Sequence, residues 1–596
     1  MIGVLLFLLS HAPLFRAAIP QREIPLVSSF PTAPAPWLPT DWRAVARAQT
    51  AFVFNATRSA TAFLPLLFWD DARANANLTT FGTPSYVGGA VGAGAPHESI
   101  AGAALVLSGL LAGAPMANLS GGGFAGVDFE RMLLAYFDRD ARIWVDALRG
   151  GSSGANMSFW YAAWSSMLPL QVAAASGTGT LLPAIRAAAA SWLRIQAALG
   201  NNFNVTGVAF APGSGAPLPV PGTARDYPLP VVSAGVAWLL YASRAALGEG
   251  DAGAPALLRG ATDALDYLLA LPYDSYWEVL MPFGALAAAR INAEQGARYN
   301  TSRLLNFILQ PGLPAHYPFR WGWGTLGGAW GAPPVDVAGL TGASSDRGGY
   351  GFAFDTFATL SALVPVARYE AQWARALGRY ASNAANAARL FFPFASARDR
   401  QSDADWVAAA GAGAEALAYE GVRRWGFNAS DANITGPYAT GDGKSQAGMP
   451  TNLAVYGGAY VGLMAALVLP SADEGVAAFD ARATDWWARE GHATTLLYNG
   501  RAAPVDALLA LPAAAAGQAF DVYDAVAQAV VARGAAPPSV RVRLGADAAA
   551  VLVAYPAGAP LERDEARNWL LAGGRVIDWQ LAPRREGGGE GAGAGK

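Results

Sequence analysis

Six helix-length stretches of this chain are almost free of charge, and most of them adjoin stretches with charge at helical spacing. The uncharged stretches span approximately residues 99–112, 156–175, 229–243, 277–289, 351–364 and 452–469. Only Glu278 and Asp355 carry charge within them. Between them, 128–149, 255–271, 301–309 and 370–389 are predicted to be amphipathic helices. A helix that is apolar on every side must be buried on every side. The alternation therefore predicts an inner ring of helices enclosed by an outer ring, an (α/α)6 toroid.

The pattern changes after about residue 490. Short apolar runs with a period of two, separated by Gly, Pro and Asp, predict a small antiparallel β-sandwich. We expect a mainly α protein divided into a signal peptide (1–18), a Pro-rich extended arm (19–40), the toroid (41–480), the β-sandwich (485–585) and a Gly-rich tail (586–596). Long connections at 200–228, 310–350 and 425–451 are predicted to be loops without regular structure that carry function.

The N-terminal residues and the asparagines both indicate export. Residues 1–18 join a short apolar run to Ala17 and Ala18, a pattern typical of a cleavable signal peptide. Eight of 18 asparagines lie in N-x-S/T sequons, whereas random placement of the 54 Ser and Thr residues would give about 1.6. The sequons are at Asn55, Asn77, Asn118, Asn156, Asn204, Asn300, Asn428 and Asn433. We expect an N-glycosylated protein that is secreted or held in the secretory-pathway lumen.

Composition excludes several other classes. The formal net charge is -3 and no Lys/Arg-rich run occurs, so nucleic acid is not an expected partner. The chain has no cysteine, which excludes disulfides and thiol catalysis, and it has no metal-ligand spacing, so no cofactor is predicted. The stretch 452–469 lacks basic flanks, and we expect a buried helix there, with no transmembrane segment in the mature chain. Gly458 and Gly462 would allow close helix approach.

Acidic and aromatic residues recur where the chain enters the inner helices, and such entrances open on one face of a ring. Glycoside hydrolysis needs a protonated acid and a second carboxylate, and flat apolar rings suit the faces of sugars. Glu278 follows Trp277 at the start of an uncharged helix and is predicted to be the acid, although complementing the helix dipole is an equal alternative. Asp346, beside Arg347, is predicted to be the base or nucleophile, with helix capping or a structural ion pair as the alternative.

Further residues complete the predicted site. Asp355 lies deeper in an apolar helix, where structural pairing is favoured over catalysis. The reserve acids are Glu98, Asp226, Glu420 and Asp442. The predicted substrate-binding residues are Trp160, Trp277, Trp321, Trp323, Tyr350, Arg347 and Tyr438.

Uncharged inner and charged outer helices followed by a β-sandwich resemble the six-hairpin glycosidase-like toroid enzymes over about residues 40–585. The resemblance is architectural and includes no catalytic motif that can be transferred residue by residue. It implies carbohydrate chemistry, which in that superfamily includes inverting hydrolases, unsaturated-glucuronyl hydrolases and polysaccharide lyases.

Three classes of function remain open at this point. The first prediction is a glycoside hydrolase that acts on poly- or oligosaccharides with a pair of carboxylates. A polysaccharide lyase acting on a uronate-containing glycan would need a Tyr or His base and a charge-neutralising group. Its candidates are His97, His316, Arg225, Arg347 and Tyr350. A non-catalytic glycan-binding toroid would have aromatic subsites without paired acids.

Overall fold

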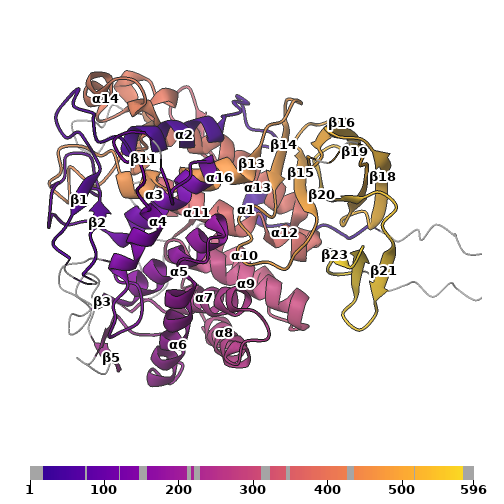
Figure 1. Ribbon diagram of the computed structural model, residues 1–596. Coiled ribbons are helices and arrows are strands. Elements are labelled where there is room, and N and C mark those ends of the chain that lie inside the picture. The colour runs from indigo at the N-terminus through magenta and orange to yellow at the C-terminus, as the bar shows by residue number, and fades with distance from the viewer. Residues whose placement is uncertain are drawn as a thin grey trace, which may run out of the picture.

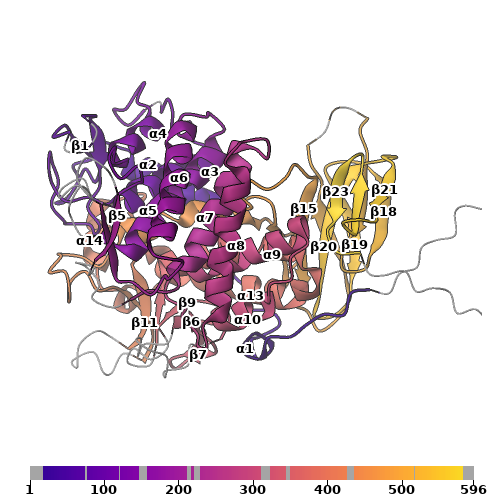
Figure 2. The same ribbon diagram turned by 90° about the horizontal axis from the view of Figure 1, so that it is seen from below.

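The computed structural model describes residues 18–581, apart from 74, 76, 120, 147–156, 211–215, 221–227, 311–322, 344–348, 426–434, 514 and 516. The chain is largely helical, with several antiparallel sheets in the C-terminal region (Figure 1). Figures 1 and 2 both place the C-terminal strands on one side of the helices. Strand β1 (Phe68–Asp70) and strand β5 (Pro217–Val220), which precede two of the inner helices, lie on the opposite side.

Six helical segments form a closed cycle of contacts. Each segment packs against the next in chain order, and the last packs against the first. The segments are α3 (Ser99–Ala112), α5 (Phe159–Ser176), α7 (Val232–Leu247), α9 (Leu280–Gln295), α11 (Ala353–Leu363) and the pair α15 (Val455–Gly458) with α16 (Val461–Leu467). Every residue of α11 is buried, as expected for a helix without a wet face. These helices overlap the six uncharged stretches, although α7 and α9 continue past them to include Arg244, Arg290 and Glu294.

Other helices cover the outside of this cycle. They are α2 (Trp42–Val53) against α16 and α3, α6 (Leu182–Ala198) and α8 (Ala254–Ala270) against α7, α10 (Thr301–Ile308) against α9, and α13 (Ala374–Ala387) against α11. Helix α8 buries one side, and its other side is exposed. This one-sided burial is the amphipathic pattern that the sequence predicted for 255–271.

The predicted helix at 128–149 is wrong over residues 137–146. The chain forms only α4 (Phe129–Met132) and the 3-10 turn η1 (Leu133–Tyr136) before it leaves helical geometry. The carboxylate of Asp138 accepts the N–H groups of Asp140 at 2.9 Å and Ala141 at 2.7 Å. These bonds close a turn and offer the backbone an alternative to the helix.

Two segments predicted to be loops contribute strands to a five-stranded antiparallel sheet in the order β12-β11-β10-β9-β6. Its strands are β6 (Trp323–Thr325), β9 (Thr341–Ala343), β10 (Tyr350–Phe352), β11 (Gly421–Trp425) and β12 (Thr435–Thr440). Strands of three residues are too short to show a period of two. A Cβ on Gly342 would lie 2.0 Å from the carbonyl oxygen of Tyr350, so glycine is needed for β9 and β10 to pair.

The C-terminal region contains a six-stranded antiparallel sheet in the order β13-β14-β15-β20-β17-β18, with smaller sheets β16-β19 and β21-β22-β23. The strands are β13 (Val468–Leu469), β14 (Val476–Asp480), β15 (Ala493–Asn499), β16 (Val505–Ala510), β17 (Phe520–Asp524), β18 (Ala529–Ala535), β19 (Ser539–Leu544), β20 (Ala548–Pro556), β21 (Leu561–Asp564), β22 (Trp569–Ala572) and β23 (Arg575–Asp578). A second hydrophobic core, which includes Val476, Leu509 and Val522, joins the six-stranded sheet to β16-β19. Strand β14 precedes the segment for which the sequence predicted strands. It is buried on both faces, so its sequence shows no alternation of apolar and polar residues.

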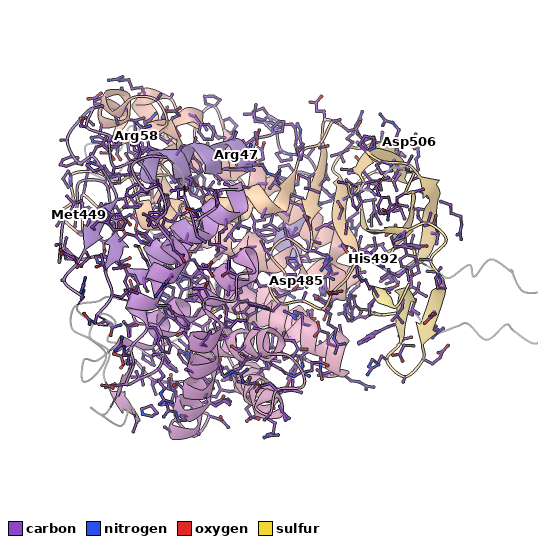
Figure 3. The ribbon with its side chains drawn as sticks, viewed as in Figure 1. Arg47, Arg58, Met449, Asp485, His492 and Asp506 are labelled. Carbon is purple, nitrogen blue, oxygen red and sulfur yellow. The ribbon has the colours of Figure 1, made fainter. Side chains whose placement is uncertain are left out.

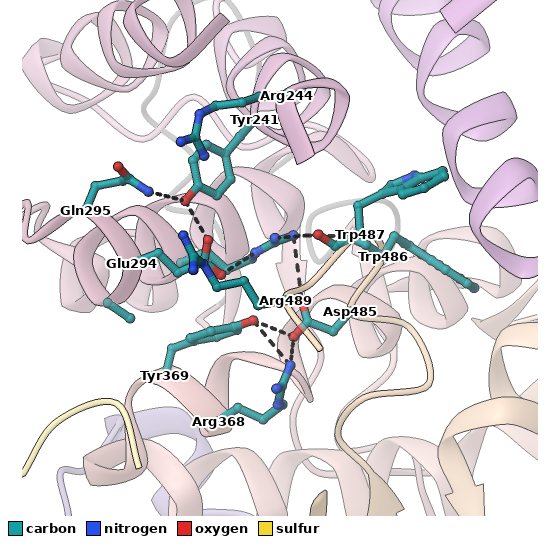
Figure 4. Close-up of polar contacts among 12 residues, drawn as sticks. Tyr241, Arg244, Glu294, Gln295, Arg368, Tyr369, Asp485, Trp486, Trp487 and Arg489 are labelled. Carbon is teal, nitrogen blue, oxygen red and sulfur yellow. Dashed lines mark hydrogen bonds and ion pairs between the residues drawn. The ribbon is translucent and has the colours of Figure 1, made fainter. Parts of the chain in front are cut away.

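Buried charges fix the connection between the helices and these sheets. Asp485 lies in this connection, between the helical body and the C-terminal strands (Figure 3). Its carboxylate accepts hydrogen bonds from Arg368 and, at 2.7 Å, from the hydroxyl of Tyr369, both on α12 (Val366–Tyr369) (Figure 4). Arg290 of α9 donates to the carbonyl oxygens of Trp486 at 2.9 Å and Trp487 at 3.0 Å. The connection is therefore anchored to two helices.

The first described residues run along the outside of α13. The N–H of Ile19 donates to the carbonyl of Val526 at 2.8 Å, and the amide of Asn383 donates to the carbonyl of Pro31 at 2.9 Å. A single helical turn, α1 (Pro25–Ser28), interrupts the extended course. This segment touches both the helices and the C-terminal sheets.

In the described part of the chain, no helix has the length and hydropathy needed to cross a membrane. The stretch 452–469 divides into α15 and α16, which are buried. A Cβ on Gly462 would lie 2.3 Å from the Cα of Ser108 in α3. Gly462 thus permits the close helix approach that the sequence predicted.

Candidate active site

The N-terminal ends of the inner helices surround a cavity of about 190 Å³. Helices α5, α11 and α15 contribute residues of their first turns, and the residues just before α3 and α9 also reach it. Two residues of the five-stranded sheet close one side. The lining consists of Ser85, Tyr86, Glu98, Ile100, Trp160, Tyr161, Glu278, Trp323, Phe352, Phe354, Asp355 and Tyr456.

Glu278 lies in the cavity wall, where the sequence predicted a catalytic acid. Its backbone is left-handed, with φ 51°. This conformation in a non-glycine residue costs about 1–3 kcal/mol and persists where the surroundings impose it. The preceding Trp277 packs edge-on against Trp323, with ring centroids 5.1 Å apart, and Asp274 accepts the N–H of Tyr276 at 2.8 Å. These contacts hold the loop that presents Glu278.

Glu98 is the second carboxyl group of the cavity. Burial raises the pKa of Glu98, and a hydrogen bond with Ser85 opposes that shift. Asp146 is its neighbour, because the carbonyl of Asp146 accepts the N–H of Ser99 at 2.7 Å. Burial, and after it the charge of Glu98, raises the pKa of Asp146 well above its usual value. Neighbouring carboxyl groups in a poorly hydrated site do not both ionise easily, so this pair favours a bound proton.

Asp355 is the third carboxyl group of the cavity lining. The sequence favoured structural pairing, but Asp355 lines the cavity from the first turn of α11 and is fully buried. Burial, and after it the charge of Asp355, raises the pKa of Tyr276. Because α11 begins at Ala353, Asp355 lies in its first turn, at the end of the helix that borders the cavity.

Aromatic rings form most of the remaining wall. Phe354 packs edge-on against Trp160 and Tyr456, with ring centroids 6.2 Å and 6.4 Å apart. Trp323 is 5% exposed, and its indole N–H has no acceptor among the described residues. Of the predicted substrate-binding residues, Trp160 and Trp323 line the cavity, whereas Trp277 supports Trp323 from behind.

Glu420, a reserve acid, lies behind the cavity wall and holds three tyrosines. It accepts hydrogen bonds from the hydroxyls of Tyr86 at 2.6 Å, Tyr350 at 2.9 Å and Tyr456, as well as from the N–H of Asp442. Burial, and after it the charge of Glu420, raises the pKa values of these tyrosines. The two oxygens of Glu420 accept four donors, an arrangement suited to fixing Tyr86 and Tyr456 and not to proton transfer with a ligand.

Asp442 and Tyr438 lie beyond this layer and outside the cavity lining. Asp442 forms an ion pair with Arg423 at 2.6 Å. The Arg423 guanidinium also lies 3.8 Å from the ring centroid of Tyr350, and Tyr438 is the register partner of Arg423 in β12. Asp442 and Tyr438 therefore lie among the residues that support the cavity wall and do not line the cavity.

His97, a predicted lyase base, is engaged elsewhere. Its Nε2 lies 3.1 Å from an oxygen of Asp70, and its Nδ1 contacts the hydroxyl of Tyr136. Burial lowers the pKa of His97. His97 is buried and outside the cavity lining, so it supports the segment before Glu98.

The remaining predicted site residues, Asp226, Asp346, Trp321, Arg347, Arg225 and His316, lie outside the described residues. Within the described ranges, no three acidic or histidine side chains are grouped so that they could hold a metal ion.

The described sequon asparagines lie at or near the surface. Asn77, Asn118, Asn204 and Asn300 are exposed, and Asn55 is partly exposed. Asn300 also caps α10, because its Oδ1 accepts the N–H of Arg303 at 3.1 Å. That bond leaves the amide nitrogen, the atom to which a glycan attaches, unused. Asn156, Asn428 and Asn433 are outside the described residues.

No protein-family model matches the chain, and no curated protein matches it. A solved structure of a GH127 β-L-arabinofuranosidase from Geobacillus stearothermophilus T6 is similar at 10% sequence identity. The alignment covers 80% of this chain and 75% of the other, with a TM-score of 0.31. A TM-score at this level does not establish a shared fold, so the geometry of the cavity remains the basis for function.

Proposed function

We propose that this chain is a glycoside hydrolase built on an (α/α)6 toroid with a C-terminal β-sandwich. The convergence of Glu98, Glu278 and Asp355 in one aromatic-walled cavity carries the proposal. The closed cycle of inner helices and their outer cover support the toroid. The second core between the six-stranded sheet and β16-β19 supports the sandwich.

Each carboxyl group has a role that its surroundings favour. The sequence predicted Glu278 as the acid, but here we assign that role to Glu98, which protonates the departing oxygen because burial favours its protonated form. Glu278, at the partly exposed loop before α9, activates water or attacks the anomeric carbon. Asp355 is the third carboxyl group of the wall, and its oxygens face the positive charge that develops in the oxocarbenium-like transition state. The aromatic rings stack on the sugar, and Trp323 donates its N–H to a hydroxyl.

The composition of the cavity favours hydrolysis over β-elimination. A lyase needs a base together with a cation or equivalent group that neutralises a uronate. The described lining contains no histidine, lysine or arginine, whereas it contains three acids. The described lining therefore suits a neutral glycan better than a uronate, whereas Arg225, His316 and Arg347 lie outside the described residues.

Leaving-group dependence tests these roles. The wild-type protein is assayed on neutral 2,4-dinitrophenyl glycosides and on the corresponding methyl glycosides and oligosaccharides. Glu98→Gln should lose about 10²- to 10⁴-fold on the poor leaving groups and much less on dinitrophenyl glycosides, which depart without a proton. Glu278→Gln should lose activity on both kinds. Full activity of Glu278→Gln would remove this residue from the mechanism, and an inactive wild-type protein that still binds the glycans would support a binding protein instead.

We further propose that the protein is N-glycosylated in the secretory pathway. The sequon excess and the surface position of the five described sequon asparagines support this. Mass spectrometry of protein from a eukaryotic host, before and after glycosidase F, should detect conversion of Asn to Asp at these positions. A mass that glycosidase F leaves unchanged would refute the proposal.

A further inference from the structure

A second, larger depression lies beside α14 (Ala404–Ala410), with a volume of about 450 Å³. Several of the side chains around it are exposed, including those of Arg398, Asp405 and Lys444. We call it the Asp403 groove. The residues that the argument uses are Phe63, Arg398, Asp403, Asp405, Trp406 and Lys444.

Two aromatic rings are held in the wall of this groove. The indole N–H of Trp406 donates to the carbonyl of Ala62 at 3.1 Å, which ties α14 to the loop that carries Phe63. Phe63 is 38% exposed and has a left-handed backbone with φ 73°. A bulky residue in this conformation is an outlier that a turn or strain must explain. The groove therefore presents two apolar rings, of which Trp406 is anchored by its hydrogen bond to Ala62 and Phe63 is partly exposed.

The polar groups of the groove are paired with each other. Asp403 is buried and accepts a hydrogen bond from Ser402 at 2.6 Å, while Lys444 lies 2.6 Å from its other oxygen. Arg398 and Asp405 form an exposed ion pair. Two basic and two acidic side chains thus cancel in charge but still offer donors and acceptors. A lining of this kind suits hydroxyl groups better than a charged ligand.

Asn452 connects the groove to the cavity. Its N–H donates to Asp403 at 2.9 Å, and its carbonyl accepts the N–H of Glu420 at 3.1 Å. Glu420 in turn binds the hydroxyl of Tyr86 in the cavity wall. The floor of the groove and the wall of the cavity therefore belong to one hydrogen-bonded unit.

We propose that the Asp403 groove is a second carbohydrate-binding site, which holds a neutral polysaccharide strand while a unit of that strand occupies the cavity. The connection to the cavity rests on the proposed glycoside hydrolase activity, whereas binding in the groove does not. Such a strand is recognised by aromatic rings that stack on sugar faces. It also needs hydrogen-bond donors and acceptors for its hydroxyl groups. The cavity, of about 190 Å³, is the smaller of the two sites.

Affinity electrophoresis of the full chain carrying Glu278→Gln tests the proposal, since this variant removes hydrolysis under the proposed mechanism. The gels contain xylan, arabinan, glucomannan or barley β-glucan. On the polysaccharide that binds, Trp406→Ala and Phe63→Ala should each weaken retention about three- to tenfold. Trp69→Ala and Phe394→Ala are the matched controls, because these aromatic residues are 40% and 44% exposed outside the groove. The controls should bind like the parent.

Thermal melting of each variant separates loss of binding from loss of folding, and Trp406→Phe, which keeps a ring, should retain most of the affinity. Parent-like retention of both Trp406→Ala and Phe63→Ala would overturn the proposal, as would the absence of binding to all four polysaccharides. If Trp406→Ala and Phe63→Ala weaken binding but the wild-type protein hydrolyses no glycoside, the groove is sustained and the hydrolase is refuted. If both variants bind like the parent and the wild-type protein hydrolyses glycosides, the groove is refuted and the hydrolase is sustained.

Discussion

The hydroxyl of Tyr86 donates to a carboxylate oxygen of Glu420 at 2.6 Å. This bond joins the segment before α3 to the residue that precedes β11, far away in the sequence. Since Tyr86 lines the cavity and Glu420 does not, the carboxylate acts on a ligand only through the ring that it positions. The wall of the cavity is thus set by a buried charge behind it.

Glu420→Gln should destabilise the protein by about 2–4 kcal/mol, because an amide supplies one acceptor oxygen where the carboxylate supplies two. Its NH₂ group would also face donors. Urea denaturation measures the change. Tyr350→Phe is the control, since it removes one donor at 2.9 Å outside the cavity lining and should cost only about 1 kcal/mol. Equal stability of Glu420→Gln and wild type would contradict the positioning role.

Ser85→Ala should shift the alkaline limb of the pH–rate profile to higher pH. The hydrogen bond with Ser85 lowers the pKa of Glu98, against the larger effect of burial. Without the hydroxyl the pKa of Glu98 rises further, and the acid stays protonated to a higher pH. Profiles of kcat/KM for both proteins on a poor-leaving-group substrate give the shift. A limb that moves to lower pH would rule out Glu98 as the acid.

Asp274→Asn should stabilise the protein at pH 8. Burial raises the pKa of Asp274 from 3.8 to about 7. Because the folded-state pKa is above the unfolded one, stability falls as pH rises between these two values. The variant lacks this penalty and keeps the acceptor for Tyr276, so it should gain about 2 kcal/mol at pH 8, after a discount for partial exposure, and nothing below pH ~3.5. Urea denaturation of both proteins at the two pH values measures the difference in the free energy of unfolding. A gain of equal size at both pH values would exclude ionisation of Asp274 as the cause of the gain.

Gly462→Ala should destabilise the protein by about 1–3 kcal/mol, because the added methyl would lie 2.3 Å from the Cα of Ser108. Gly457→Ala is the matched control on the same segment. The nearest atom to its added methyl would be 3.6 Å away, which is ordinary contact. Thermal melting should separate the two variants, and similar melting temperatures would show that α3 and α16 can move apart at little cost.

The inner helices could be predicted because burial on all sides leaves a direct mark on a sequence. Helix α11 is buried along its whole length, and a charged residue at most of its positions would be costly. The five-stranded sheet left no such mark. Its strands at 323–325, 341–343 and 350–352 are three residues long, and their glycines serve backbone packing, which resembles loop composition.

The candidate site was predicted in part, for a related reason. Glu278 stood out because a carboxylate at the start of an apolar helix needs an explanation. To predict that Asp355 and Glu98 line the cavity, one must know the residues at which α11 and α3 begin. A shift of two residues decides whether a side chain faces the cavity or the core. The role of Glu420 depended on Tyr86, Tyr350 and Tyr456 meeting from three parts of the chain, which no local pattern records.

The contact between α3 and α16 joins the first inner helix of the chain to the last one. As the chain leaves the ribosome, α3 emerges early and α16 emerges only after every other inner helix, so one flank of an all-apolar helix stays uncovered through most of synthesis. Surface of this kind promotes aggregation before folding is complete. We therefore expect chains that stop before residue 455 to be retained by chaperones, and expect release to depend on the last inner helix reaching the first.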